Sequence, residues 1–278
     1  MLVASLVAVA VVAGAAALRD RRAVSSAGTE TGPVHVHGLG VDPADGTLFV
    51  ATHTGLWRVA PGEAKAARVG TSRRDLMGFT VAGPGHFLAS GHPDSRREPP
   101  LLGLIESRDA GETWTSISLA GEADFHVLRL AGRRLYGYDA SHGRLLVRRG
   151  LGRPWERLGT PATIGDLAVS PIDPFRLLAT TDKGLFESAD GGRSWRRVAS
   201  VFGLLAWPLP HELLRVEENG DLLTSADRGR NWTPVGAIGG EPAAFAARSP
   251  TELYVALHDG TIKRSTDAGR SWEVHSTP

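Results

Sequence analysis

An eight-residue pattern that recurs along the chain constrains the fold more than any other feature. It reads Ser-x-Asp-x-Gly-x-Ser/Thr-Trp over residues 107–114, 188–195 and 265–272, and residues 225–232 depart from it only in Asn231. Successive copies start 81, 37 and 40 residues apart. Because the first spacing is twice the others, a degenerate copy is expected midway, where residues 148–155 keep Gly152 and Trp155 in register. A fixed period of about 40 residues indicates a repeat architecture.

Each repeat contains four short strand-like segments. In the unit that begins at Ile164 we expect strands at 164–170, 176–181, 185–188 and 195–199, joined by turns at 171–174 and 182–184 and by the octapeptide. Four antiparallel strands per repeat, arranged radially, form the blades of a β-propeller. A further unit without an octapeptide fits near residues 56–69. The sequence therefore predicts an all-β fold, a six-bladed β-propeller of four-stranded antiparallel blades over residues 34–278. A β-sandwich, the competing all-β fold, does not account for an octapeptide at a fixed period.

All the recurring residues of the octapeptide can act within the turn itself, through local hydrogen bonds, backbone conformation or apolar packing. The Asp can accept hydrogen bonds from amides of its own turn, and the Gly supplies a positive φ. The Ser or Thr hydroxyl can close a second local bond, and the Trp can bury a large apolar area between sheets. We therefore predict a structural role for this motif. Its Asp and Trp residues are Asp109, Trp114, Asp190, Trp195, Asp227, Trp232, Asp267 and Trp272.

The motif resembles the Asp-box, or BNR repeat, of sialidases, sortilin-type receptors and photosystem-assembly propellers. The segments HVHGLGVDP, DLMGFT, SGHPD and GEADFHVLR are similar to those of bacterial exported Asp-box proteins that are usually labelled glycosylhydrolases. The resemblance covers about residues 34–274 and implies a propeller with Asp-box turns. It leaves the activity open, because the box occurs in enzymes and receptors alike. The Arg-Ile-Pro motif that a sialidase of this superfamily usually carries is absent from the sequence.

The N-terminal segment predicts export. Residues 1–18 form an apolar run without a charge, followed by Arg-Asp-Arg-Arg. We expect residues 1–23 to be a signal peptide or an N-terminal membrane anchor and the small, polar residues 24–33 to be a linker. The propeller would then lie outside the cytoplasm, secreted or anchored, with membrane contact only through this segment.

Composition excludes several classes of function. The chain has no cysteine, which rules out disulfides, a thiolate nucleophile and iron–sulfur ligation. Lys and Arg number 31 against 30 Asp and Glu, and this balance does not indicate a nucleic-acid partner. The expected partner is a small ligand, a glycan or a protein at one face of the propeller.

Histidines crowd onto one predicted face. We define the upper face as the one where the first strand of each blade begins and where the turn between its second and third strands lies. Three first strands begin with paired residues at i, i+2 spacing, which project together from a strand. The upper-face histidines are His35, His37, His53, His92, His126, His142 and His258, and the paired positions are His35 and His37, Asp75 and Met77, and Asp124 and His126.

Three interpretations of this face stay open. A metal site would use His35, His37, His53, His92 and His126, with Met77 for copper or with Asp75 or Asp124 for zinc. A glycoside hydrolase would need two carboxylates across a cleft, for which Asp75, Asp124 and Asp166 are the candidates. The third interpretation is a polar channel mouth with solvated histidines. We favour a ligand-binding or accessory module with a His-rich upper-face site, with the glycoside hydrolase as the alternative.

Overall fold

The computed structural model describes residues 32–278. The predicted signal peptide or anchor and most of the predicted linker lie outside the described residues, so the export of the chain stays a prediction. Within residues 32–278 there is no helix that could cross a membrane.

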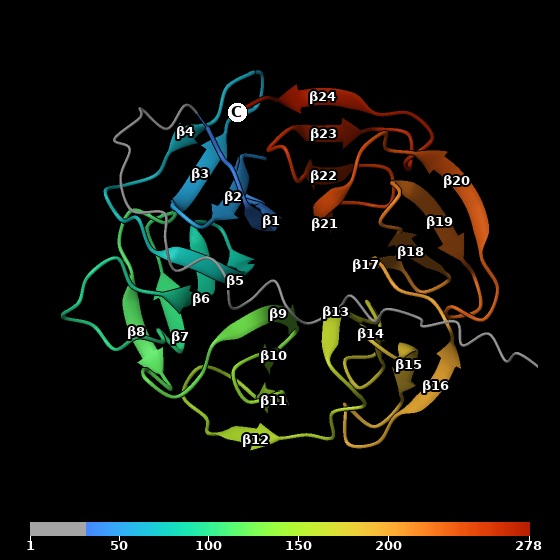
Figure 1. Ribbon diagram of the computed structural model, residues 1–278, viewed down its shortest axis with the longest axis horizontal. Coiled ribbons are helices and arrows are strands. Elements are labelled where there is room, and N and C mark those ends of the chain that lie inside the picture. The colour runs from blue at the N-terminus through green and yellow to red at the C-terminus, as the bar shows by residue number, and fades with distance from the viewer. Residues whose placement is uncertain (1–31) are drawn as a thin grey trace, which may run out of the picture. The chain divides into compact units, whose positions relative to one another are not determined.

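Twenty-four strands form six sheets of four (Figure 1). We number the sheets as blades 1 to 6 in chain order. Blade 1 contains β1 (Val36–Val41), β2 (Leu48–Thr52), β3 (Gly55–Val59) and β4 (Ala67–Arg68); blade 2 contains β5 (Asp75–Gly83), β6 (His86–His92), β7 (Leu104–Ser107) and β8 (Thr115–Ser118); blade 3 contains β9 (Phe125–Ala131), β10 (Arg134–Asp139), β11 (Arg144–Arg148) and β12 (Trp155–Arg157). Blade 4 contains β13 (Ile164–Val169), β14 (Leu177–Thr181), β15 (Gly184–Ser188) and β16 (Arg196–Ala199); blade 5 contains β17 (Leu204–Leu209), β18 (Glu212–Val216), β19 (Asp221–Ser225) and β20 (Thr233–Ala237); blade 6 contains β21 (Pro242–Ala247), β22 (Leu253–Leu257), β23 (Ile262–Ser265) and β24 (Glu273–Ser276).

The predicted six-bladed propeller is confirmed. Within each blade, consecutive strands pair antiparallel, and the first strand of each blade lies innermost (Figure 1). The unit at Ile164 has its four strands within one or two residues of the expected bounds. The degenerate copy at 148–155 connects β11 to β12 in blade 3, as its spacing predicts.

The ring closes without exchanging a strand between its two ends. All four strands of blade 1 and of blade 6 come from consecutive segments. Closure depends on apolar packing of Leu48 and Val50 of blade 1 against Tyr254 and Ala256 of blade 6. A parallel bridge between Lys65 and Thr277 adds a backbone connection at the same seam.

The hydrophobic core is divided into six clusters, one at each seam between neighbouring blades. Strand β2 shows why: Leu48 and Val50 face blade 6, whereas Phe49 and Ala51 face blade 2. Successive side chains of a strand point to opposite faces, so a blade covered on both faces needs apolar residues at successive positions. All five residues of β2 are accordingly buried.

The octapeptide of blade 4 forms a closed network around Asp190. Its Oδ1 accepts hydrogen bonds from the Ser188 hydroxyl at 2.8 Å and the Ser194 amide at 2.9 Å. Its Oδ2 accepts one from the Ser194 hydroxyl at 2.6 Å. The Trp195 indole donates to the Gly159 carbonyl of blade 3 at 2.9 Å, which fastens the turn to the preceding blade. The copies in blades 5 and 6 repeat the Asp-centred bonds.

The Trp and the Gly of the octapeptide both pack against the preceding blade, at the seam between the two blades. The Trp of each copy packs onto that seam; the five are Trp114, Trp155, Trp195, Trp232 and Trp272. Blade 1 has no copy, and Trp57 on β3 is buried at its seam with blade 6 instead. Gly229 has a φ of +81°, and a Cβ there would lie 2.3 Å from Leu185 of blade 4. The turn therefore needs glycine both for its backbone conformation and for the close approach.

First strands carry a β-bulge near their upper ends. In five blades the register against the second strand shifts by one residue at the second or third position of the strand. A bulge leaves one residue without a cross-strand partner and redirects its side chain. The bulged residues are His37, Met77, His126, Gly165 and Ala243.

We predict that Asp190→Ala lowers the free energy of unfolding at pH 7 by about 1 kcal/mol, the scale for hydrogen bonds to a partly exposed carboxylate. Hydrogen bonds from the Ser194 hydroxyl and amide lower the pKa of Asp190 from 3.8 to about 2. The folded state therefore binds this proton less readily than the unfolded state, and the stabilisation is lost as the pH falls from about 4 through about 2. Urea unfolding followed by tryptophan fluorescence measures both quantities.

The matched control is Asp190→Asn, which keeps one acceptor oxygen in the turn and should lose less stability. An Asp190→Ala variant as stable as the wild type at pH 7, or a deficit that does not shrink in acid, would contradict the structural role of the turn.

Candidate functional site

Blades 1 to 3 bring five histidines and two aspartates together at the upper face. His35 directly precedes β1, His37 lies on β1, and His53 lies in the turn between β2 and β3. Asp75 begins β5, His92 ends β6, Asp124 directly precedes β9, and His126 lies on β9. Sequence reasoning named all seven as candidates, and the fold places them in one continuous group.

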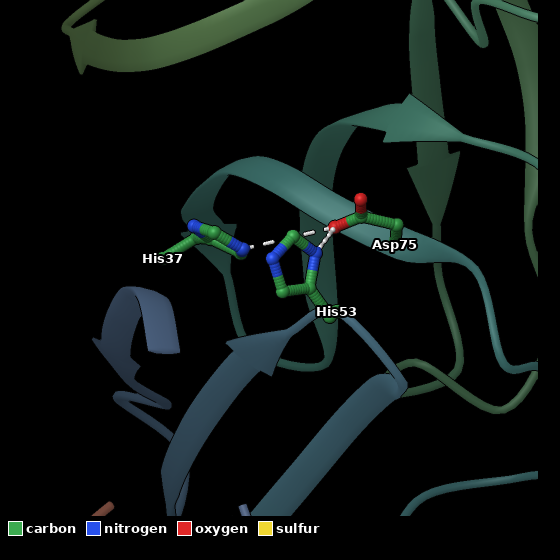
Figure 2. Close-up of side chains that lie close together, drawn as sticks. All are labelled: His37, His53 and Asp75. Carbon is green, nitrogen blue, oxygen red and sulfur yellow. Dashed lines mark ion pairs between the residues drawn. The ribbon is translucent and has the colours of Figure 1, made fainter. Parts of the chain in front are cut away.

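His37, His53 and Asp75 form the tightest part of this group (Figure 2). One ligand atom from each lies within 4.8 Å of the other two. His53 Nδ1 is 2.9 Å from Asp75 Oδ1, and His37 Nε2 is 3.7 Å from the same oxygen. The two imidazoles meet edge to face, with ring centres 4.4 Å apart. Two nitrogens and one oxygen thus converge from two blades.

The imidazole of His92 links this trio to a second carboxylate. Its Nδ1 lies 3.4 Å from Asp75 Oδ2, and its Nε2 lies 3.5 Å from Asp124 Oδ2. Asp124 Oδ2 is also 2.8 Å from His126 Nε2. On the other side of the trio, the ring centre of His35 is 5.2 Å from that of His53.

The bulge position carries a ligand-type side chain in only one half of this face. It presents His37, Met77 and His126 in blades 1 to 3, but Gly165 and Ala243 in blades 4 and 6. A central cavity of about 110 Å³ is lined by His37, His126, Gly165 and Ala243, and Arg129 and Asp166 line it as well.

Burial keeps His37 neutral. Desolvation and, to a smaller extent, the neighbouring His53 together lower its pKa from 6.5 to about 4, against the opposing effect of Asp75. Its Nε2 is buried and has no hydrogen-bond partner within residues 32–278. A neutral imidazole nitrogen without a hydrogen bond is the form in which histidine binds a metal.

The pKa values of Asp75 and His92 are shifted in opposite directions. Burial alone would raise the pKa of Asp75, but hydrogen bonds from His53 and His92 outweigh it and hold that pKa well below its usual range. The hydrogen bond to Asp75 raises the pKa of His92, against the opposing effect of burial. At neutral pH the centre of the group is therefore a carboxylate among imidazoles.

A buried aspartate that sequence reasoning missed supports Asp124. Asp139, at the end of β10, accepts a hydrogen bond from the Asp124 amide at 3.1 Å. It also accepts bonds from Arg144 Nε at 2.7 Å and from His142 Nδ1 at 2.9 Å. Asp124 Oδ1 is buried and without a hydrogen-bond partner in the described part of the chain. The segment Asp-Ala-Ser-His at 139–142 follows directly after a predicted strand on the upper face, and this position could have identified Asp139 as a candidate.

Asp166 lies apart from the group. In blade 4, Thr163 occupies the position that Asp75 and Asp124 have in their own blades. Asp166 lies three residues after Thr163. Asp166 Oδ1 accepts a bond from Arg129 of blade 3 at 2.6 Å, and Oδ2 accepts one from the Leu205 amide of blade 5 at 2.8 Å. These bonds join three blades. His258 likewise lies apart, 3.9 Å from Glu241 in blade 6.

The loop between β6 and β7 is tied down beside Asp75. Asp94 accepts a hydrogen bond from the Arg73 amide at 2.7 Å. Glu98 forms an ion pair with Arg74 at 2.7 Å. Residues 93–103 therefore hold the segment that leads into β5 and brings Asp75 to the trio.

We predict that His37 stays neutral down to about pH 4 and that His92 protonates above the ordinary histidine pKa of 6.5. Asp75→Asn should lower the pKa of His92, because the carboxylate that stabilises the imidazolium is removed. Titration of the imidazole resonances by NMR measures these values. The resonances of His211, which is exposed and outside the group, serve as the internal reference. An unchanged pKa of His92 in Asp75→Asn would contradict this geometry.

No protein-family model matches the chain, and no curated protein matches it in sequence. It is similar to a structure of YCF48 bound to a D1 peptide, with a TM-score of 0.57 and 13% identity, covering 87% of this chain and 82% of that chain. YCF48 from Cyanidioschyzon merolae gives a TM-score of 0.54 and 14% identity, covering 89% and 86%.

The chain is also similar to part of a larger enzyme. The GH74 xyloglucanase from Xanthomonas campestris gives a TM-score of 0.56 and 18% identity, covering 88% of this chain but 38% of the enzyme. At these identities the likenesses show the β-propeller fold alone, in a peptide-bound protein and in a glycoside hydrolase. Membership of the Asp-box superfamily stays a prediction.

Proposed function

We propose that this chain is a zinc-binding β-propeller that acts as a ligand-binding or accessory module. The observation that carries the proposal is the convergence of His37, His53 and Asp75, with one buried imidazole nitrogen that has no hydrogen-bond partner within residues 32–278.

The distances within the trio suit a tetrahedral ion. Zinc–ligand distances of 2.0–2.1 Å place two ligands of a tetrahedral zinc about 3.3 Å apart. The two ligand-to-ligand distances to Asp75 Oδ1, 2.9 Å from His53 and 3.7 Å from His37, lie on either side of this value. Two nitrogens and one oxygen are a donor set typical of zinc with one position open for water or a ligand.

The surrounding residues support the same role. Metal-bound imidazoles and carboxylates are usually held by a further shell of hydrogen bonds. His92 would belong to this further shell, because its Nδ1 contacts Asp75. Its other ring nitrogen, Nε2, contacts Asp124. Copper is the second choice, since Met77, two residues after Asp75, occupies the bulge of blade 2.

We propose the upper face as the surface that meets the partner and the extracytoplasmic space as the place of action. The likeness to a propeller bound to a peptide supports a protein or other ligand as the partner. The apolar run at residues 1–18 supports export.

We predict that the purified protein binds about one equivalent of Zn²⁺ at neutral pH, measured by isothermal titration calorimetry. His53→Ala and Asp75→Asn should each weaken binding by at least about tenfold, since each removes one of three ligands. Binding should also weaken below about pH 6 as exposed imidazoles protonate. The control His211→Ala should bind as the wild type does.

No uptake of zinc or copper, or uptake that His53→Ala and Asp75→Asn leave unchanged, would contradict the metal proposal. Hydrolysis of chromogenic glycosides that is lost in Asp75→Asn or Asp124→Asn and persists without metal would favour the glycoside hydrolase instead, since His92 lies between these two carboxylates.

A further inference from the structure

A second cluster of charged side chains lies at the opposite end of the propeller. Its centre is Glu187 on β15, which directly precedes the octapeptide of blade 4. The Glu187 side chain is only 2% exposed. Four arginine guanidiniums surround its carboxylate. They belong to Arg176, Arg196, Arg228 and Arg230.

Positive charge is in excess at this cluster. Arg176 contacts Glu187 at 2.8 Å, Arg228 at 3.4 Å and Arg230 at 3.5 Å, and Arg196 forms a fourth ion pair. A second carboxylate, that of Asp173, is 3.9 Å from Arg176. In the ion pairs of this cluster, four guanidiniums therefore face two carboxylates. Each guanidinium offers five N–H donors, whereas a carboxylate accepts about four hydrogen bonds, so donors exceed the acceptors that Glu187 supplies.

The fold does not require this arrangement. Glu106 stands at the same place before the octapeptide of blade 2, is also buried, and contacts His86 at 2.6 Å and Arg108 at 2.7 Å. One arginine and one histidine are therefore enough to surround a glutamate that is buried at this place. Blade 4 collects three more guanidiniums than that, two of them from blade 5.

Arg228 holds its position at a backbone cost. It has a φ of +63°, in the left-handed region that disfavours residues with a Cβ. The equivalent positions of the other three well-preserved copies have the same positive φ and are occupied by small residues, namely Ala110, Gly191 and Ala268. Arg228 differs from them in its long cationic side chain, which contacts Glu187 of the neighbouring blade.

A cavity of about 220 Å³ opens beside the cluster, lined by Arg176, Arg196, Arg228, Ser194 and Trp195 together with Glu187. This volume is below the range of about 300–1,000 Å³ in which drug-sized ligands bind. Guanidiniums bind the oxygens of tetrahedral anions through paired N–H donors. Size and charge therefore both favour a small multivalent oxyanion.

We propose that the seam between blades 4 and 5 binds a phosphate or sulfate group through Arg176, Arg196 and Arg228, at a site separate from the histidine group. Glu187 holds the guanidiniums in place, and their excess charge attracts the anion. The ligand is free phosphate or sulfate, or the same group on a larger molecule.

Titration calorimetry with inorganic phosphate and with sulfate at low ionic strength tests the proposal. The wild type should bind one equivalent saturably. Arg228→Gly should weaken binding at least about tenfold without lowering Tm, since glycine suits the left-handed backbone. Glu187→Gln should tighten binding, because it removes a negative charge while the remaining amide oxygen still accepts hydrogen bonds from the guanidiniums. Arg108→Ala at Glu106 is the matched control and should change affinity less than twofold.

Several results would overturn the proposal. These are the absence of saturable binding, an equal loss of affinity in Arg228→Gly and Arg108→Ala, and tighter binding of acetate than of phosphate or sulfate. The proposal would also be overturned if Arg228→Gly had a normal Tm and bound phosphate and sulfate as tightly as the wild type does. A titration with methyl phosphate beside inorganic phosphate distinguishes an esterified group from the free ion.

Discussion

Apolar packing at the seams between blades is the interaction on which this structure depends. Within residues 32–278 no strand crosses from one end of the chain to the other, so closure of the ring between blades 6 and 1 depends on an apolar cluster and a short bridge. Each blade contributes to two clusters through alternate side chains of the same strands. The octapeptide acts on the same seams, because its Trp and its Gly both contact the preceding blade. A repeat of this kind is stable only when its neighbours cover both faces.

Much of the fold could be predicted from the sequence because the repeat is a local signal. The octapeptide places one turn in every blade that has a copy, and the apolar segments around it locate the strands. Blade 1 shows the limit: it lacks a copy, and the use of Trp57 in place of an octapeptide Trp depends on a contact with blade 6. The close approach of Gly229 to Leu185 is equally nonlocal, since the two lie in different blades.

The candidate site was predictable in its members and only partly in its geometry. The positions of His35, His53 and His92 follow from strand direction, which sets the face on which a turn lies. The bulges at His37 and His126 are not visible in the sequence, because a bulge arises from how two strands pair. Asp166 illustrates the consequence. It resembles Asp75 and Asp124 in the sequence but lies three residues further along its strand, where it bonds to neighbouring blades.

The two ends of the propeller carry groups of opposite chemistry. The upper face has carboxylates among imidazoles, and the seam of blades 4 and 5 has guanidiniums in excess over carboxylates. Crystals soaked with Zn²⁺ and measured at the zinc absorption edge test the proposed zinc site of the upper face most directly. We predict an anomalous peak bounded by His37, His53 and Asp75, which disappears in Asp75→Asn. A peak at another place, or no peak in the wild type at neutral pH, would contradict it.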